Sequence, residues 1–279
     1  MRVLTFAESN SASSEILHSV QDDIERIKYT MKKLKEFLPA IATICAFLIM
    51  WQLYVTAGFI SAATLPAPTA IFQAIYEFRT IIWQHTLQTL VETLIGLGLS
   101  VVLGVVTGII IFSSDTIRKS VYPLLVLSQT IPIIALAPLL LIWFGFDMTP
   151  KIIIVVLFCF FPICVAVSDA LLYPDEQYID LLKSMRASSW QTMRYIRLPA
   201  ALPAFFSGLR ISTTYAITGA IVGEYVGSYQ GLGIFMQTAA HSHAIVLVFA
   251  ALFVAVAISL VLLTAVSIVE RIIIPWKKR

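Results

Sequence analysis

Charged residues are so widely spaced along this chain that they divide it into long uncharged stretches. One such stretch runs from residue 37 to residue 76, and another separates Glu224 from Glu270. Only 13% of the 279 residues are charged, whereas 59% are hydrophobic. A helix that crosses the hydrocarbon core of a bilayer needs about 20 predominantly apolar residues. The pattern predicts an all-α membrane protein and argues against a water-soluble enzyme.

The uncharged stretches predict six transmembrane helices. Proline residues inside the third and fourth of them predict kinks, because proline removes a backbone donor that neighbouring helices or water must compensate. These prolines are Pro132, Pro138 and Pro162. The six predicted spans cover residues 37–59, 94–112, 121–144, 152–168, 205–226 and 244–269.

The distribution of basic residues predicts the orientation of these spans. If the N-terminus is cytoplasmic, all of the 19 lysine and arginine residues except Arg79 and Lys151 lie on the cytoplasmic side. This bias places both termini in the cytoplasm. The net charge of +3 is too small to indicate a nucleic-acid partner.

Residues 1–30 are predicted to be a polar N-terminal extension, separate from a membrane domain over residues 31–279. The extension is either disordered or the product of a misassigned start, since Met31 is followed by Lys32, Lys33 and Lys35 and then by the first span. A short amphipathic cytoplasmic helix is the alternative.

The largest cytoplasmic loop, at about residues 173–203, is the expected contact with a partner. Its first part predicts a helix that places Leu181, Leu182 and Met185 on an apolar patch, beside charged residues on the other faces. A turn and a second short helix, stopped by Pro199, are expected to follow.

This loop resembles the signature loop of bacterial ABC-importer permeases. The residues that fall at the family's spacing are Asp180, Leu181, Leu182, Arg186, Ile196, Leu198 and Pro199. Motifs elsewhere in the chain resemble the nitrate, sulfonate and taurine branch, which includes permeases for thiamine-pyrimidine precursors and riboflavin. These motifs are Leu65-Pro66-Ala67-Pro68, Thr130-Ile131-Pro132, Gly223-Glu224 and Gly231-Leu232-Gly233.

The resemblance implies a multi-pass permease of the bacterial cytoplasmic (inner) membrane with the type I ABC-importer fold. It implies three kinds of protein partner: an ATPase subunit that binds ATP and Mg²⁺, an extracytoplasmic substrate-binding protein, and a second permease, expected as a homodimer. This chain itself is expected to have no catalytic residue, metal site or cofactor, and its sequence has no Gly-x-x-x-x-Gly-Lys-Ser/Thr motif. The residues expected to contact the ATPase are Asp180, Leu181, Leu182, Lys183, Met185, Arg186, Ala187, Ile196, Leu198 and Pro199.

Arg186 departs from the family pattern, which has glycine at this position. Glycine adopts a left-handed backbone conformation at little cost, whereas arginine is strained there. We therefore expect the turn either to be built differently or to be shifted by a residue.

The expected translocation path combines polar and aromatic residues of the third and fifth spans. Since Arg210 is the only cation within the predicted spans, an anionic cargo is disfavoured, and a thiamine-pyrimidine precursor or a similar heterocycle is preferred. Nitrate, a sulfonate or taurine is the alternative cargo. The path residues are Gln129, Thr130, Pro132, Ser212, Tyr215 and Glu224.

Two other classes of protein remain open. A secondary transporter needs a coupling carboxylate at membrane depth, for which Glu92 is the only candidate. An intramembrane hydrolase would need Ser207 close to His241 or His243, but the predicted topology places the histidines at the far end of the fifth span. The two histidines alone are weak evidence for a metal site.

Overall fold

The computed structural model describes residues 38–276, and every regular element in that range is a helix. The prediction about residues 1–30 lies outside the described residues. The chain divides into two compact units, residues 1–69 and 70–279, which are treated separately below.

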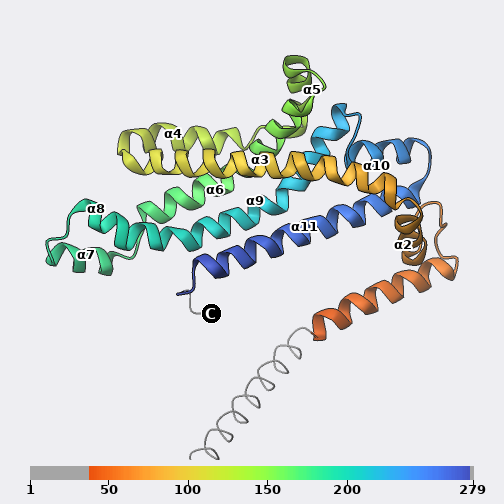
Figure 1. Cartoon of the computed structure of the whole chain (residues 1–279), viewed down its shortest axis with the longest axis horizontal. Coiled ribbons are helices and arrows are strands. Elements are labelled where there is room, and N and C mark those ends of the chain that lie inside the picture. Colours follow the sequence, from red (N-terminus) through yellow and green to blue (C-terminus); the bar gives the residue numbers. More distant parts are fainter. Residues whose placement is uncertain (1–37, 277–279) are drawn as a thin grey trace, which may run out of the picture. The chain divides into compact units, whose positions relative to one another are not determined.

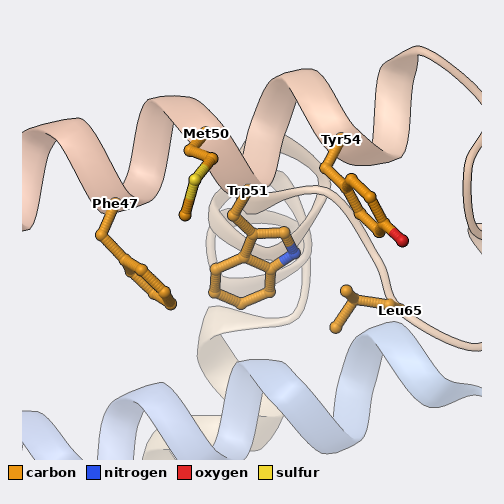
Figure 2. Close-up of a pocket in the computed structure, with 5 residues that line it drawn as sticks. All are labelled: Phe47, Met50, Trp51, Tyr54 and Leu65. Carbon is orange, nitrogen blue, oxygen red and sulfur yellow. The ribbon is translucent and has the colours of Figure 1, made fainter.

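The described part of the first unit consists of the helix Leu38–Thr56, a connecting turn and the start of α2 (Pro68–Glu77). The helix is long and apolar enough to cross a membrane, as predicted for the first span. The backbone amide of Thr69 donates to Gln52 Oε1 at 3.2 Å and so ties the connector to the helix. Apolar side chains of the helix and the connector surround a pocket of about 460 Å³ (Figure 2), lined by Phe47, Met50, Trp51, Tyr54 and Leu65.

The second unit is built around three long helices, α3 (Arg79–Ser113), α6 (Met148–Leu172) and α9 (Leu198–Gly227). Helix α6 packs along both α3 and α9 (Figure 1). The remaining elements are α4 (Asp115–Ser128), α5 (Ile133–Phe144), α7 (Glu176–Ser184), α8 (Ser189–Thr192), α10 (Leu232–His241) and α11 (Ile245–Ile273).

Small residues allow the three central helices to approach one another closely. A Cβ atom added to Gly96 of α3 would lie 2.5 Å from the Cβ of Val155, and one added to Gly208 of α9 would lie 2.6 Å from the carbonyl oxygen of Pro162. Ser212 Oγ of α9 also donates to the carbonyl oxygen of Cys159 at 2.6 Å. Close backbone approach and interhelical hydrogen bonds are the interactions that hold helices together in lipid, where the hydrophobic effect between helices is weak.

The third predicted span is broken into two helices. Helices α4 and α5 meet at an angle of 94°, and the break ends at Pro132, the N-cap of α5. Proline disfavours helical geometry for the residue before it and lacks the amide that would continue the hydrogen-bond ladder. Pro138 and Pro162, by contrast, lie inside α5 and α6 without ending either helix.

Between residues 38 and 276, four helices are long and apolar enough to cross a membrane, or five if α4 and α5 form one broken span. The predicted count of six therefore depends on α9. This helix has 30 residues but is less apolar than the four single-helix spans, because serine, threonine and glycine residues interrupt its hydrophobic sequence. Helix α3 begins 15 positions before the predicted start of the second span at Leu94.

Candidate functional site

The loop between α6 and α9 exposes an apolar surface on α7. Tyr178, Leu181 and Met185 are 57%, 57% and 68% exposed. Their spacing places them along one face of the helix. Leu182 is half-buried, and the exposed ion pair between Lys183 and Asp180, at 3.0 Å, lies on the opposite side of the helix from the apolar face.

The turn after α7 is a Schellman motif with Arg186 in the left-handed conformation, at φ +55°. The amide of Ala187 donates to Leu182 O at 3.0 Å, and that of Arg186 donates to Lys183 O at 2.9 Å. These are the two hydrogen bonds that define the motif, in which glycine is the usual left-handed residue. The expectation that the turn would be rebuilt or shifted is wrong: the arginine occupies the position and the conformation that suit glycine.

A second helical segment begins directly after this turn. Ser188 caps α8 through a reciprocal pair of hydrogen bonds with Gln191. A π-helical turn, Met193–Arg197, then leads into α9 without a break. Pro199 lies in the first turn of α9, and the helix continues through it, so the expectation that Pro199 stops a short helix is wrong. Ile196 and Pro199 are half-buried, and Leu198 is 42% exposed.

Arg197 joins the end of this loop to the central helices. Its Nη1 donates to the carbonyl oxygen of Leu171 at the end of α6, and its guanidinium lies 4.9 Å from the ring centroid of Phe112 on α3. A guanidinium over an aromatic face is attracted by the ring quadrupole. One side chain therefore connects the loop to two helices of the core.

The predicted path residues of the third span lie at the break between α4 and α5. Gln129, Thr130 and Pro132 are all exposed there. The hydroxyl of Thr130 donates to Leu127 O at 2.7 Å, so it is already satisfied by the backbone.

The predicted path residues of α9 fall on two different faces of that helix. Ser212 and Glu224 are fully buried, and Ser212 bonds to α6. Tyr215 is 47% exposed, and its ring stacks on Phe158 with the centroids 6.4 Å apart. The structure therefore brings Tyr215 to an accessible face and places Ser212 and Glu224 between helices.

Two ionisable side chains of α9 and α11 form an ion pair in the half of α9 nearer the α7–α8 loop. Arg210 Nη2 lies 2.8 Å from Glu270 Oε2 of α11, which is 8% exposed. A buried charge is stable only when it is paired. Arg210 therefore links α9 to α11.

A family model for the inner membrane component of binding-protein-dependent transport systems matches residues 100–279. This range contains the whole α7–α8 loop and the helices on both sides of it. The chain belongs to this family.

Relatives of this permease are named as transport permeases, and two of these names belong to the predicted branch. A "Probable ABC transporter permease protein" of Haemophilus influenzae is 39% identical over 225 residues, which are 81% of this chain and 92% of the relative. The "Formylaminopyrimidine transport permease protein ThiX" of Halalkalibacterium halodurans is 35% identical over 77% of this chain and 86% of its own. The "Riboflavin transport system permease protein RibX" of Chloroflexus aurantiacus is 31% identical over 91% of this chain and 97% of its own. The predicted family and branch are confirmed.

A solved structure shares the fold of the permease. An inward-facing structure of the MetNI methionine ABC transporter matches with a TM-score of 0.58 and 19% identity, covering 74% of this chain and 99% of the matched chain. The resemblance to the ABC-importer permease fold is thereby confirmed for most of the chain.

The sequence did not indicate that Lys151 of the permease is buried. Lys151 was expected on the outer side, before the fourth span; it lies in the first turn of α6 and is 4% exposed. Its ammonium nitrogen lies 3.7 Å from Glu92 Oε1 of α3. The signal in the sequence was Glu92 itself, since a buried carboxylate needs a partner.

Proposed function

We propose that this chain is the six-span permease subunit of an ATP-driven importer in the bacterial inner membrane, and that the α7–α8 loop is its contact with the ATPase subunit. The exposed apolar face of α7 carries this proposal. Tyr178, Leu181 and Met185 are exposed on one face of a helix that is capped at both ends. Surfaces that face water rarely present a contiguous patch of large apolar side chains unless a partner binds there. A helix that presents such a face typically binds in a hydrophobic groove on a partner.

Arg197 supports a mechanical role for this contact. Movement of the loop by a partner would be transmitted to α6 and α3 through the bond to Leu171 O and the contact with Phe112. Rigid-body movement of packed helices between two arrangements would then open the path alternately to each side of the membrane.

The exposed face of α9 supports its proposed place in the path and in a homodimer interface. Thr214, Tyr215 and Thr218 are exposed on this face. Their hydroxyl groups would gain little from contact with lipid. A second copy of the chain, or water in a translocation path, would provide a better environment. Both termini are proposed to lie in the cytoplasm, and an extracytoplasmic binding protein to deliver the cargo.

The proposed cargo is a thiamine-pyrimidine precursor or a similar uncharged heterocycle. Two observations favour it: the stacked pair of Phe158 and Tyr215 offers an aromatic surface, and a relative named for formylaminopyrimidine transport covers most of the chain. Lys151 and Arg210 each form an ion pair with a glutamate, so neither cation is available to bind an anionic cargo.

The test of the proposed contact is co-purification of the permease with its partner ATPase subunit. The double substitution Leu181→Asp and Met185→Asp places charges on the apolar face, and we expect it to abolish co-purification while leaving membrane insertion intact. Ser189→Asp is the matched control, because it adds a carboxylate to the same exposed loop without removing apolar surface. Unchanged co-purification of the double variant would remove the contact from α7.

A further inference from the structure

Another apolar pocket, of about 190 Å³, lies in the second unit where α3 and α6 end and α9 begins, beside the α7–α8 loop (Figure 1). Its eight lining residues come from these three helices and are all hydrophobic. Among them, Leu171 and Ala201 are buried, whereas Ile109 and Leu198 are 40% and 42% exposed. The pocket therefore has a buried base and opens at the surface of the protein.

The size and lining of this pocket favour a narrow, apolar occupant. Pockets that bind small molecules usually enclose about 300–1,000 Å³ and contain a few polar groups that orient the ligand. This pocket is smaller, and none of its lining residues has a polar side chain. An acyl chain of a membrane lipid makes only dispersion contacts, so it needs no orienting hydrogen bond and suits such a groove.

Arg194 extends the face of α9 that forms one wall of the pocket. Leu198, Leu202 and Phe205 lie at positions i, i+4 and i+7 and so share one face of the helix. Arg194 lies four positions before Leu198, in the π-helical turn that continues into α9, and its side chain is exposed. Among the side chains that the structure describes, none forms an ion pair with Arg194. An available positive charge therefore lies about one helical turn beyond Leu198.

Arg197 adds a second positive charge at the same end of the pocket. Its Nη1 donates to the carbonyl oxygen of Leu171, which lines the pocket, and its guanidinium lies over the ring of Phe112. The single carboxylate in the last two turns of α6, Asp169, is two positions from both Val167 and Leu171 and therefore lies on the opposite face of that helix. The open end of the pocket is thus positively charged, and charge complementarity favours an anionic headgroup there.

We infer that this pocket binds one acyl chain of an anionic phospholipid, whose phosphate is held by Arg194 and Arg197. A guanidinium has five N–H donors, so Arg197 can bond to a phosphate oxygen while it keeps its bond to Leu171 O. The acyl chain contacts α3, α6 and α9 at once, and we therefore expect bound lipid to stabilise their packing. The inference requires only that this chain is a membrane permease, and it is independent of the cargo and of the proposed ATPase contact.

The first test is thermal unfolding of the transporter, purified in detergent through a tag on the permease, with added phosphatidylglycerol or phosphatidylcholine of identical acyl chains. We expect phosphatidylglycerol to bind more tightly and to raise the unfolding temperature more. Arg194→Gln should weaken the binding of phosphatidylglycerol about fivefold, the effect of one basic residue on an anionic lipid, and leave that of phosphatidylcholine unchanged. Arg271→Gln is the matched control, because it neutralises an exposed arginine in the last turn of a different helix, α11. Equal effects of the two lipids, stabilisation by glycerol phosphate alone, or equal losses in the two variants would overturn the inference.

A phosphatidylglycerol with a photoreactive diazirine in its acyl chain locates the site directly and needs no variant. After irradiation, we expect labelled peptides from residues 105–109 and 198–205, and an excess of unlabelled phosphatidylglycerol should remove this label. Label confined to other segments would contradict the inference. Label that appears here only after the ATPase is removed would also contradict it, because a protein partner would then fill the pocket. Loss of the ATPase during purification would count against the proposed function alone, since the pocket is formed entirely by the permease.

Discussion

At the scale of single residues, Arg186 shows how a sequence can depart from a family pattern without changing the backbone. Its φ of +55° costs an L-residue about 1–2 kcal/mol relative to glycine. Glycine loses about 0.5–1 kcal/mol more through the entropy of the unfolded chain. We expect Arg186→Gly to stabilise the permease by about 0.5–1 kcal/mol and to retain transport, measured by thermal unfolding and by uptake into vesicles.

Arg186→Ala is the matched control, because it removes the same side chain but keeps the strained conformation. We expect it to unfold at the same temperature as the wild type. Loss of transport in both variants would show that the guanidinium makes a functional contact with the partner and that backbone geometry is not its main role.

At Gly231 we expect the loss of glycine to destabilise the protein. It has φ +126°, and an added Cβ would lie 2.2 Å from the side-chain carboxyl carbon of Glu224. Gly231→Ala should therefore destabilise the permease by about 2–4 kcal/mol, through strain and overpacking together. Gly98→Ala is the control, because nothing lies within 4 Å of the Cβ position there and the helix should tolerate alanine. Equal thermal stability of the two variants would contradict the close packing of the turn on Glu224.

At the scale of elements, Arg197 is expected to connect the loop to the helices that move. Replacing it with alanine removes both the bond to Leu171 O and the contact with Phe112. We expect Arg197→Ala to keep its bound ATPase but to lose about tenfold in transport per ATP hydrolysed, because movement of the loop is no longer passed on to α6 and α3. The measurement is uptake and hydrolysis in the same vesicles.

Arg194 supplies the control for this prediction. It lies three positions earlier in the same π-helical turn and is exposed. Arg194→Ala should leave the ratio of transport to hydrolysis unchanged. A similar loss in both variants would indicate that the charge of the loop matters and that the link to α6 does not.

The sequence predicted elements well where the signal is local. Hydropathy located the long apolar helices, and the spacing from Asp180 to Pro199 located the loop. It did not predict features that depend on contacts between residues far apart in the chain. Helix α3 extends back to Arg79 because its polar residues there bond to distant partners, as Thr89 does to Glu224, 135 positions away. Hydropathy cannot show such pairing, so the predicted span began only at Leu94 and the helix that precedes it was not predicted.

The bend between α4 and α5 could be predicted only in part. Pro132 marked the position of a kink, but the 94° angle depends on how α5 packs on α6 and α9. Likewise, the proline pattern alone could not distinguish Pro199, which begins a helix, from a residue that ends one.

At the scale of the whole molecule, we propose that the permease imports a small solute, driven by ATP hydrolysis in a partner subunit that binds the exposed face of α7. The most direct measurement is ATP hydrolysis by the complex reconstituted with its ATPase and binding protein, in the presence of hydroxymethylpyrimidines, riboflavin, taurine, alkanesulfonates or nitrate. We predict stimulation by a pyrimidine in the wild-type complex and none in the variant that carries Leu181→Asp and Met185→Asp. Import that continues without the ATPase, or equal stimulation of the wild type and the variant, would contradict the claim.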